Sequence, residues 1–286
     1  MVMAEEKIKE PIVYGAGLYT VELNDGLTEQ EQEEAYKILC WLKGSGPFFG
    51  IAGLMLITGM PRQGKGLFSN TFSWKIKRYF KGIRILRDDH PGPIYGEYSL
   101  FDESVLAGDL EAMSEIAKIK KPDKKLIDKW VTEKGQVMIH KAVLQLDEGW
   151  RYQNNRRPMA EMNIALGGLN KLWGHTETLT MLQAQWYHDL DRFTCLPWVT
   201  HEVRCQMSTE KENTIEAHLY RVKYNVMTSR LIVLDKAIKL YIDGAKERPE
   251  LGVSHVDADG TPHYYRYFDL YNSKSAPMMK YKGGQL

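Results

Sequence analysis

Ile51-Ala-Gly-Leu-Met-Leu-Ile-Thr58 is a short apolar run of the kind that forms a buried strand, and it leads directly into Gly59-Met-Pro-Arg-Gln-Gly-Lys-Gly66. A helical pattern follows from Leu67 to Tyr79. Strand, glycine-bounded loop and helix, with the spacing G-x-x-x-x-G-K, form the context of a phosphate-binding P-loop. Glycines let backbone N–H groups turn around phosphate oxygens, and the helix N-terminus adds a favourable dipole. The segment therefore predicts a nucleotide-binding site.

The residues expected around the phosphates belong to the loop and to the start of the helix. Lys65 would supply the positive charge that reaches the β- and γ-phosphates. Gly66 stands where a Ser or Thr hydroxyl normally binds Mg²⁺, so the metal must be held differently here. The alternative is a glycine-rich turn with a surface lysine. The expected nucleotide-binding residues are Gly59, Met60, Pro61, Arg62, Gln63, Gly64, Lys65, Gly66 and Leu67.

A second apolar run, Ala142-Val-Leu-Gln-Leu146, ends in the acidic residues Asp147 and Glu148. Carboxylates at the end of a buried strand are costly unless they meet a cation or a hydrogen-bond network. In P-loop enzymes the first acid orients Mg²⁺ and the second polarises the attacking water, which would make Asp147 the metal residue and Glu148 the base. A solvated acidic turn is the alternative. The two motifs, about 80 residues apart and in this order, predict a nucleoside triphosphatase.

Several arginines follow the acidic pair. Arg151, Arg156 and Arg157 come just beyond it, and Arg192 closes the segment Asp189-Leu-Asp-Arg192, which we expect to open a short helix. An arginine that reaches a γ-phosphate across a subunit boundary accelerates phosphoryl transfer by orders of magnitude. Arg157 and Arg192 are therefore candidate catalytic residues. Structural ion pairs or DNA-facing charges are the alternative for the three arginines nearest the acidic pair.

A third buried strand is expected from Thr178 to Leu182, and Gln183-Ala-Gln185 ends it. A glutamine at the tip of a strand beside the acidic strand can orient water or sense the γ-phosphate. Gln185 is the better candidate for this role, and a simple capping role is the alternative, more so for Gln183.

Composition indicates an ordinary globular protein. With 286 residues, 43% hydrophobic and 26% charged, the chain can bury a sizeable core. A formal net charge of +1 gives no global field for nucleic acid, although a ring could concentrate charge locally. Three cysteines without paired spacing predict reduced thiols in an intracellular protein. Since no apolar run reaches the ~18 residues of a membrane span, we expect a soluble protein.

Three parts are expected along the chain. Residues 1–49 would form an N-terminal arm and a helix opened by the capping box Thr28-Glu-Gln-Glu31. Residues 50–245 would form an α/β core, because the strand Ile83–Leu86 after the P-loop helix completes a βαβ unit and so a mostly parallel sheet flanked by helices. Residues 246–286 would form a C-terminal extension and a flexible tail.

The second half of the core is expected to be rich in strands. Val199–Cys205 alternates like a half-exposed strand, and residues 215–234 read as a hairpin that continues toward residues 239–244. Residues 102–134 look helical and charged instead. The expected fold is thus α/β with a β-rich C-terminal part.

These motifs, taken as an ordered set, resemble the FtsK–HerA superfamily. The set comprises Gly59 to Lys65, the strand Ile83–Leu86, Leu146-Asp-Glu-Gly-Trp-Arg151, and Leu182-Gln-Ala-Gln185 followed by Asp189-Leu-Asp-Arg192. Within the superfamily it is similar to the Zot-like proteins of filamentous phages and to the packaging ATPases of tailless, membrane-containing viruses. Phe268-Asp-Leu-Tyr-Asn-Ser-Lys274 resembles the end of a Zot-type domain.

The resemblance implies a RecA-like P-loop ATPase core that uses ATP and Mg²⁺, assembles into a ring and moves DNA through its centre. It makes Lys65 the phosphate-binding lysine, Asp147 the Mg²⁺-linked acid, Glu148 the catalytic base and Gln185 the strand-end sensor. Two departures from the family pattern are Gly66 and the pair Arg62-Gln63, which replaces small residues inside the loop. Either departure could mean slow hydrolysis or a side chain supplied from elsewhere.

The leading hypothesis is an oligomeric ATP-driven DNA translocase that packages a viral genome. It would work in the host cytoplasm, associated with the virion vertex, and its partners would be DNA, further copies of the chain, and a capsid vertex or portal-like membrane protein. A Zot-like phage assembly or extrusion ATPase is the first alternative, and the lack of a membrane segment in this chain weighs against it. There are two further alternatives. One is a catalytically weak nucleotide-binding module, which the lack of a hydroxyl at Gly66 favours, and the other is a small-molecule kinase.

Overall fold

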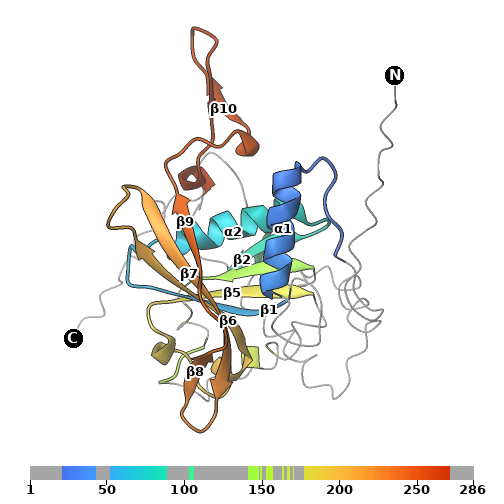
Figure 1. The fold of residues 1–286 in the computed structure, drawn as a ribbon. Helices are drawn as coiled ribbons and strands as arrows, with labels where there is room; N and C mark the ends of the chain where they lie inside the picture. Colours follow the sequence, from blue (N-terminus) through green and yellow to red (C-terminus); the bar gives the residue numbers. More distant parts are fainter. Residues whose placement is uncertain are drawn as a thin grey trace, which may run out of the picture.

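The fold is built around one large mixed sheet (Figure 1). The computed structural model describes residues 21–42, 52–88, 103–105, 141–147, 149, 153–156, 163, 166–167, 170 and 177–270. Within these ranges nine strands form the sheet, and six of them are parallel neighbours. In spatial order the six are β3 (Glu103–Val105), β2 (Arg84–Asp88), β4 (Ala142–Leu146), β5 (Thr178–Ala184), β1 (Gly53–Thr58) and β6 (Val199–Met207).

The three middle strands lie in the interior of the molecule. Every residue of β4 and β5 is buried, and so is every residue of β1 after Gly53. A parallel strand covered on both faces reads as a continuous apolar run, which is the pattern that predicted these strands. The expected mostly parallel core is thereby confirmed.

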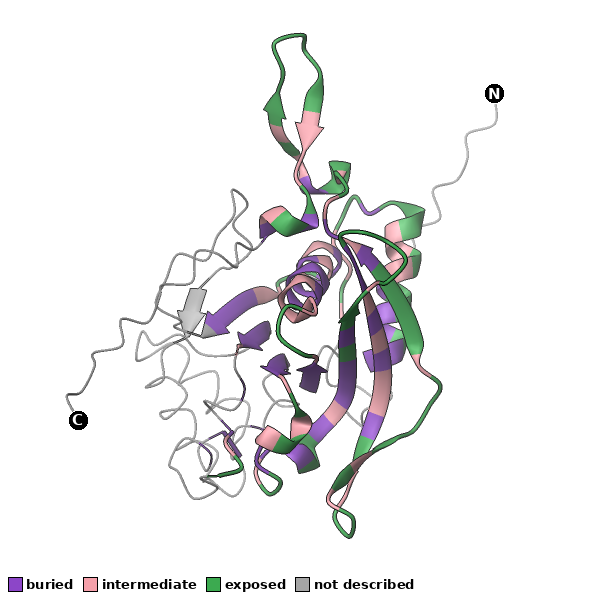
Figure 2. Cartoon of the chain, turned by 90° about the vertical axis from the view of Figure 1, so that its left-hand side faces the viewer, coloured by how far each residue is buried: buried purple, intermediate pink, exposed green. Residues whose placement is uncertain are grey.

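The remaining strands make the chain β-rich toward its C-terminus. Strand β7 (Thr214–Asn225) is antiparallel to β6, and its far edge pairs with β9 (Ile238–Asp243) and then with β8 (Arg230–Val233). Strands β10 (Val253–Val256) and β11 (Pro262–Tyr264) form a separate hairpin that stands out from the body and is largely exposed (Figures 1 and 2).

Two helices cover one face of the sheet. Helix α1 (Glu29–Leu42) starts with the predicted capping box, because Thr28 Oγ1 accepts the Glu31 N–H at 3.2 Å and Glu31 Oε2 accepts the Thr28 N–H at 2.8 Å. Helix α2 (Lys65–Tyr79) follows the P-loop and packs against α1. The short 3₁₀ turns are Tyr187–Asp189, Leu196–Trp198, Pro249–Leu251 and Tyr267–Leu270.

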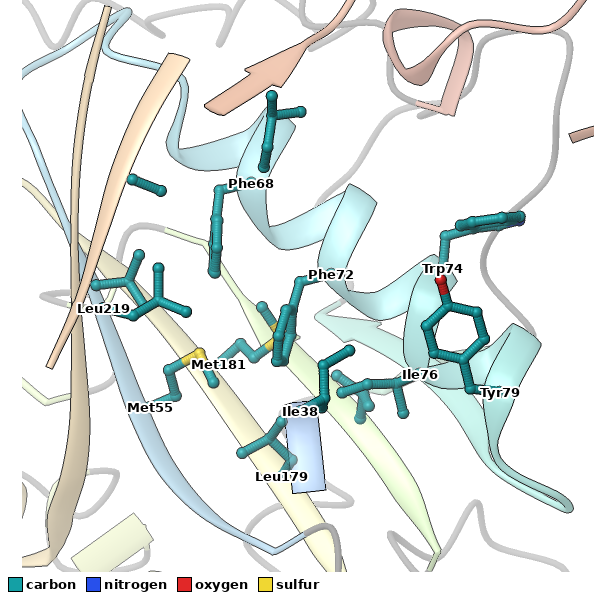
Figure 3. Packing of buried hydrophobic residues seen from close by; sticks show 14 of the residues in the cluster. Ile38, Met55, Phe68, Phe72, Trp74, Ile76, Tyr79, Leu179, Met181 and Leu219 are labelled. Atoms are coloured by element: carbon teal, nitrogen blue, oxygen red, sulfur yellow. The ribbon is translucent and has the colours of Figure 1, made fainter. Parts of the chain in front are cut away.

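Each face of the sheet has its own apolar core. On the helix face, Phe68 and Phe72 stack with ring centroids 5.4 Å apart and lie over Met55 and Met181 of the sheet (Figure 3). On the opposite face, a second cluster includes Leu54, Leu56, Leu144 and Leu182. Successive side chains of one strand therefore lie in different cores, because they point alternately to the two faces of a pleated sheet. The sheet is thus held rigidly from both sides.

Two local expectations were wrong. The 3₁₀ turn ends at Asp189, and Asp191 Oδ1 accepts the N–H groups of Phe193 at 2.8 Å and Thr194 at 2.6 Å, which makes a turn instead of a helix start. Glu103–Val105 is a strand at the sheet edge, because pairing with β2 outweighs the local helical pattern. Among the helices that the structure describes, none is long and apolar enough to cross a membrane.

Candidate nucleotide-binding site

The loop between β1 and α2 is pressed against the neighbouring strands. Gly59 has φ +153°, and a Cβ there would lie 2.6 Å from the carbonyl oxygen of Cys205. Gly64 has φ +83°, and a Cβ there would lie 2.2 Å from Cγ2 of Ile215. Both positions therefore require glycine, for backbone conformation as well as for space. The glycines of the motif thus let the loop fit closely against β6 and β7.

The unusual pair inside the loop has a structural explanation. Gln63 Oε1 accepts the backbone N–H of Met207 at 2.7 Å, which ties the loop to the end of β6. Arg62 adopts φ +63°, a left-handed conformation uncommon for residues other than glycine, and its side chain is exposed at the cavity. The Gln63 side chain thus anchors the loop to β6, which a small side chain at this position cannot do.

The P-loop lysine lies folded over its own loop. Lys65 Nζ donates hydrogen bonds to the carbonyl oxygens of Gly59 at 2.7 Å and Met60 at 3.2 Å. Helix α2 begins at Lys65, and no side chain caps its N-terminus. The first N–H groups of the helix thus face the cavity together with an ammonium group, which is the arrangement that binds phosphate.

A cavity of about 460 Å³ opens in front of this helix end. Its volume is in the range of small-molecule sites, roughly 300–1,000 Å³. The predicted residues Asp147 and Gln185 line it, which brings the acidic strand and the glutamine strand to the P-loop as expected. The other lining residues are Pro61, Arg62, Gly64, Lys65, Gly66, Leu67, Asn70, Arg87, Gln145, Gln183, Met207, Ile215, Tyr267 and Phe268.

Two buried glutamines hold helix α2 against the sheet. Gln145 Nε2 on β4 donates to Ser73 Oγ at 2.8 Å and to the Ser69 carbonyl oxygen at 3.3 Å. Gln183 Nε2 on β5 donates to Ser69 Oγ at 3.2 Å. These bonds fix α2 relative to β4, which leads into Asp147, and relative to β5, which leads into Gln185. Gln183 therefore positions the helix, whereas Gln185 faces the cavity from just beyond the strand.

Asp147 lies directly after β4 and its side chain is 28% exposed. Arg87 of β2 approaches it, with Nη2 3.9 Å from Asp147 Oδ2, and the Arg87 side chain is only 8% exposed. The positive charge of the buried guanidinium attracts the Asp147 carboxylate and restrains its position at the cavity that both residues line. Arg87 is not part of the sequence motifs, and the structure brings it to the cavity through its position near the end of β2.

The cavity also contains oxygen atoms suited to Mg²⁺. Asn70 lines it, and the buried Asn70 Oδ1 accepts no hydrogen bond in the part of the chain that the structure describes. Asn70 follows Gly66 by four residues and so lies on the same face of α2. Amide and carboxylate oxygens are the ligands that hard cations prefer. Asp147 and Asn70 could therefore hold Mg²⁺, with Asn70 in place of the hydroxyl that Gly66 lacks.

The predicted arginines are placed differently. Arg192 is exposed and its guanidinium lies 4.8 Å above the ring of Phe193, beside a second cavity of about 230 Å³ that includes His188 and Arg230. Arg192 is not among the residues that line the cavity at the P-loop of its own chain. Arg156 is exposed in a turn. The predicted residues Glu148, Arg151 and Arg157 lie outside the described residues.

Comparison with known proteins gives remote structural matches alone. No family model matches the sequence, and no curated protein matches it. The N-terminal domain of zonular occludens toxin from Neisseria meningitidis is 14% identical, with a TM-score of 0.41, covering 78% of this chain and 100% of that domain. The genome packaging NTPase B204 from Sulfolobus turreted icosahedral virus 2, in complex with AMPPCP, is 15% identical, with a TM-score of 0.37 over 65% of this chain and 98% of the other.

EccC from Thermomonospora curvata (ATPases 2 and 3) is 12% identical, with a TM-score of 0.36, over 54% of this chain and 31% of that protein. The toxin domain and the packaging NTPase are of the two kinds that the sequence resembles.

Proposed function

We propose that this chain is a P-loop ATP hydrolase that drives DNA translocation in a ring and is of the kind that packages a viral genome. The observation that supports ATP hydrolysis is that Lys65 and Asp147 line one cavity at the N-terminus of α2, although they are 82 positions apart in the sequence. A cation, the N-terminus of a helix and a carboxylate in one cavity are the elements that phosphoryl transfer requires.

Each of these groups would have a defined task during hydrolysis. The loop backbone and the start of α2 would bind the phosphates, and Lys65 would exchange the carbonyl oxygens of Gly59 and Met60 for phosphate oxygens. Asp147 and Asn70 would hold Mg²⁺, which neutralises charge on the phosphates when bound. Glu148, next to Asp147 in the sequence, would accept the proton of the attacking water.

The proposal of a ring is supported by the position of Arg192. Its side chain is exposed and is not among those lining its own nucleotide cavity, as expected of an arginine that acts in a neighbouring subunit. Arg157 stays a second candidate for this role. The proposal of DNA as the moved substrate is supported by the resemblance of the ordered motifs to DNA-translocating ATPases.

Mixing of variant subunits tests the arginine directly. An Arg192→Ala chain has an intact P-loop but cannot supply the arginine to the active site of a neighbouring subunit. A Lys65→Ala chain cannot hydrolyse ATP in its own site but still supplies Arg192 to its neighbour. We expect each variant alone to be inactive and the mixture to regain part of the ATP turnover, with Arg157→Ala tested in the same way. Arg230→Ala, which alters the same second cavity, is the matched control and should retain activity.

The alternatives give different results. If neither Arg192→Ala nor Arg157→Ala lowers the ATP turnover of the assembled protein, the trans-acting arginine is contradicted. A Zot-like extrusion ATPase would be stimulated by single-stranded rather than double-stranded DNA. A catalytically weak binding module would bind ATP without turnover, and a small-molecule kinase would transfer phosphate regardless of DNA.

A further inference from the structure

The protruding β10–β11 hairpin carries a group of side chains unrelated to the nucleotide cavity (Figures 1 and 2). His255 and Asp257 are two residues apart along one arm, and His263 pairs with His255 across the hairpin. One ligand-type atom from each of the three lies within 4.8 Å of the other two. Two imidazoles and a carboxylate in this arrangement are typical ligands of first-row transition metal ions.

The hydrogen bonds around the histidines determine which ring nitrogens carry a lone pair. His263 Nδ1 lies 2.9 Å from Glu247 Oε1, so this nitrogen carries a hydrogen and donates it. His255 Nδ1 lies 3.0 Å from Ser254 Oγ, and the single hydroxyl hydrogen of Ser254 is donated to the carbonyl oxygen of His263 at 3.1 Å. Ser254 Oγ must therefore accept from His255 Nδ1. In the neutral rings, both Nε2 atoms are left as acceptors.

Both Nε2 atoms converge on one carboxylate. His263 Nε2 lies 2.9 Å from Asp257 Oδ2, and His255 Nε2 lies 3.6 Å from Asp257 Oδ1. The two rings stack in parallel, with centroids 4.6 Å apart and an interplanar angle of 8°. A cation at this point, either a proton on a histidine Nε2 or a metal ion bound by all three side chains, would be attracted by the Asp257 carboxylate.

We propose that His255, Asp257 and His263 bind one divalent metal ion of the Zn²⁺ type and that this ion fastens the hairpin. Glu247 and Ser254 are positioning residues, since a carboxylate or hydroxyl on the second ring nitrogen fixes the tautomer and orientation of a metal-binding histidine. Solvent would complete the coordination, because the group is exposed. An isolated two-stranded hairpin is marginally stable in water, so a bound ion would add order where packing supplies little.

The test uses the 286-residue protein without a tag or bound nucleotide, with Zn²⁺ binding measured by calorimetry and Co²⁺ binding by visible absorption. We expect one ion per chain, and a loss of affinity of at least about tenfold for His255→Ala, His263→Ala and Asp257→Asn. Glu247→Gln and Ser254→Ala should each weaken binding by a smaller factor. Asp259→Asn on the same hairpin and His188→Ala elsewhere on the surface are the matched controls and should bind normally.

Two results would overturn the proposal: no binding of either ion by the wild type, or binding that the three ligand variants leave unchanged. The exposed thiol Cys40 is the competing site, and Cys40→Ser shows whether it contributes. The Co²⁺ spectrum of the wild type gives a readout that needs no variant, because thiolate ligation produces an intense near-ultraviolet charge-transfer band that nitrogen and oxygen ligands lack. Such a band would contradict a site made of two histidines and one aspartate.

Discussion

The guanidinium group of Arg87 lies 3.9 Å from the carboxylate of Asp147, at the carboxyl ends of β2 and β4. Both side chains line the cavity in front of the P-loop. The arginine is nearly buried, so its charge acts in a medium that screens it less than water does. Arg87 is therefore placed to restrain the position of the Asp147 carboxylate at the cavity.

Replacing Arg87 by alanine should lower kcat/KM for ATP by at least about tenfold. This loss corresponds to roughly 1.4 kcal/mol, the lower end of the range for an interaction with a charged partner. Steady-state ATP hydrolysis measures it. Arg84→Ala, on the same strand but not among the residues lining the cavity, is the matched control. Equal activity of the two variants would show that Arg87 has no role at the site.

Replacing Asn70 by alanine should raise the Mg²⁺ concentration needed for half-maximal turnover by about tenfold, because an oxygen ligand is lost. The fold should be little affected, since the buried Asn70 Oδ1 accepts no hydrogen bond from any residue that the structure describes. Thr71→Ala removes another buried oxygen that accepts no bond within the described ranges and is absent from the cavity lining, so it serves as the control. A Mg²⁺ titration of ATP hydrolysis gives the result.

A double variant makes the same prediction sharper. Gly66→Ser restores the hydroxyl of the usual motif, so it should rescue much of the defect of Asn70→Ala. If Asn70→Ala and Thr71→Ala give the same Mg²⁺ dependence, or if Gly66→Ser does not help, the assignment of Asn70 is wrong.

Replacing Gly64 by alanine should abolish tight nucleotide binding. The new Cβ would clash with the side chain of Ile215, and the backbone has φ +83°, so the loop must change shape. Gly82→Ala provides the comparison, because Gly82 has φ +73° but nothing within 4 Å of a Cβ. We expect Gly82→Ala to cost about 1 kcal/mol of stability and to leave binding intact. Titration with a fluorescent ATP analogue distinguishes them, and similar affinities would contradict the close loop packing.

The free energy of unfolding should depend on pH through His201. Burial, opposed by the hydrogen bond to the Trp41 carbonyl oxygen, lowers the pKa of His201 from 6.5 to about 4. Below pH 6.5 the unfolded chain binds a proton that the folded chain does not, so stability is complete above 6.5 and is lost as the pH falls toward 4. This difference corresponds to about 3 kcal/mol.

Urea unfolding at pH 7 and pH 5 measures this dependence. His201→Gln has no titrating group at this position, so its stability should fall less between the two pH values than that of the wild type. His188→Ala, which removes an exposed histidine, should show the wild-type change. An identical pH dependence in His201→Gln would mean that another group is responsible.

The central part of the fold was predictable because its signals are local. The apolar run before the P-loop, the glycine spacing and the capping box at Thr28 each depend on a few neighbouring residues, and the structure has β1, the loop and α1 where they predict them. The strand Glu103–Val105 was missed since three residues carry no periodic pattern and become a strand through pairing with β2. The β10–β11 hairpin was not predicted for the same reason, because its strands are also very short.

The site was predictable where a motif fixes spacing and unpredictable where side chains meet through the fold. Lys65, Asp147 and Gln185 came from motifs, and all three line the cavity. Asn70 is a polar residue inside a helix, and nothing in its sequence neighbours indicates that it lines the cavity. Gln63 looked like a departure from the motif, because its partner, the Met207 N–H, is 144 residues away.

ATP hydrolysis with and without DNA, measured for the wild type and for Glu148→Gln, tests the proposed function most directly. The account predicts turnover that DNA stimulates in the wild type and that is lost in the variant, while both proteins bind ATP, because Glu148 acts on the attacking water and not on the phosphates. Tight ATP binding without turnover in either protein would contradict it and would make the chain a nucleotide-binding module.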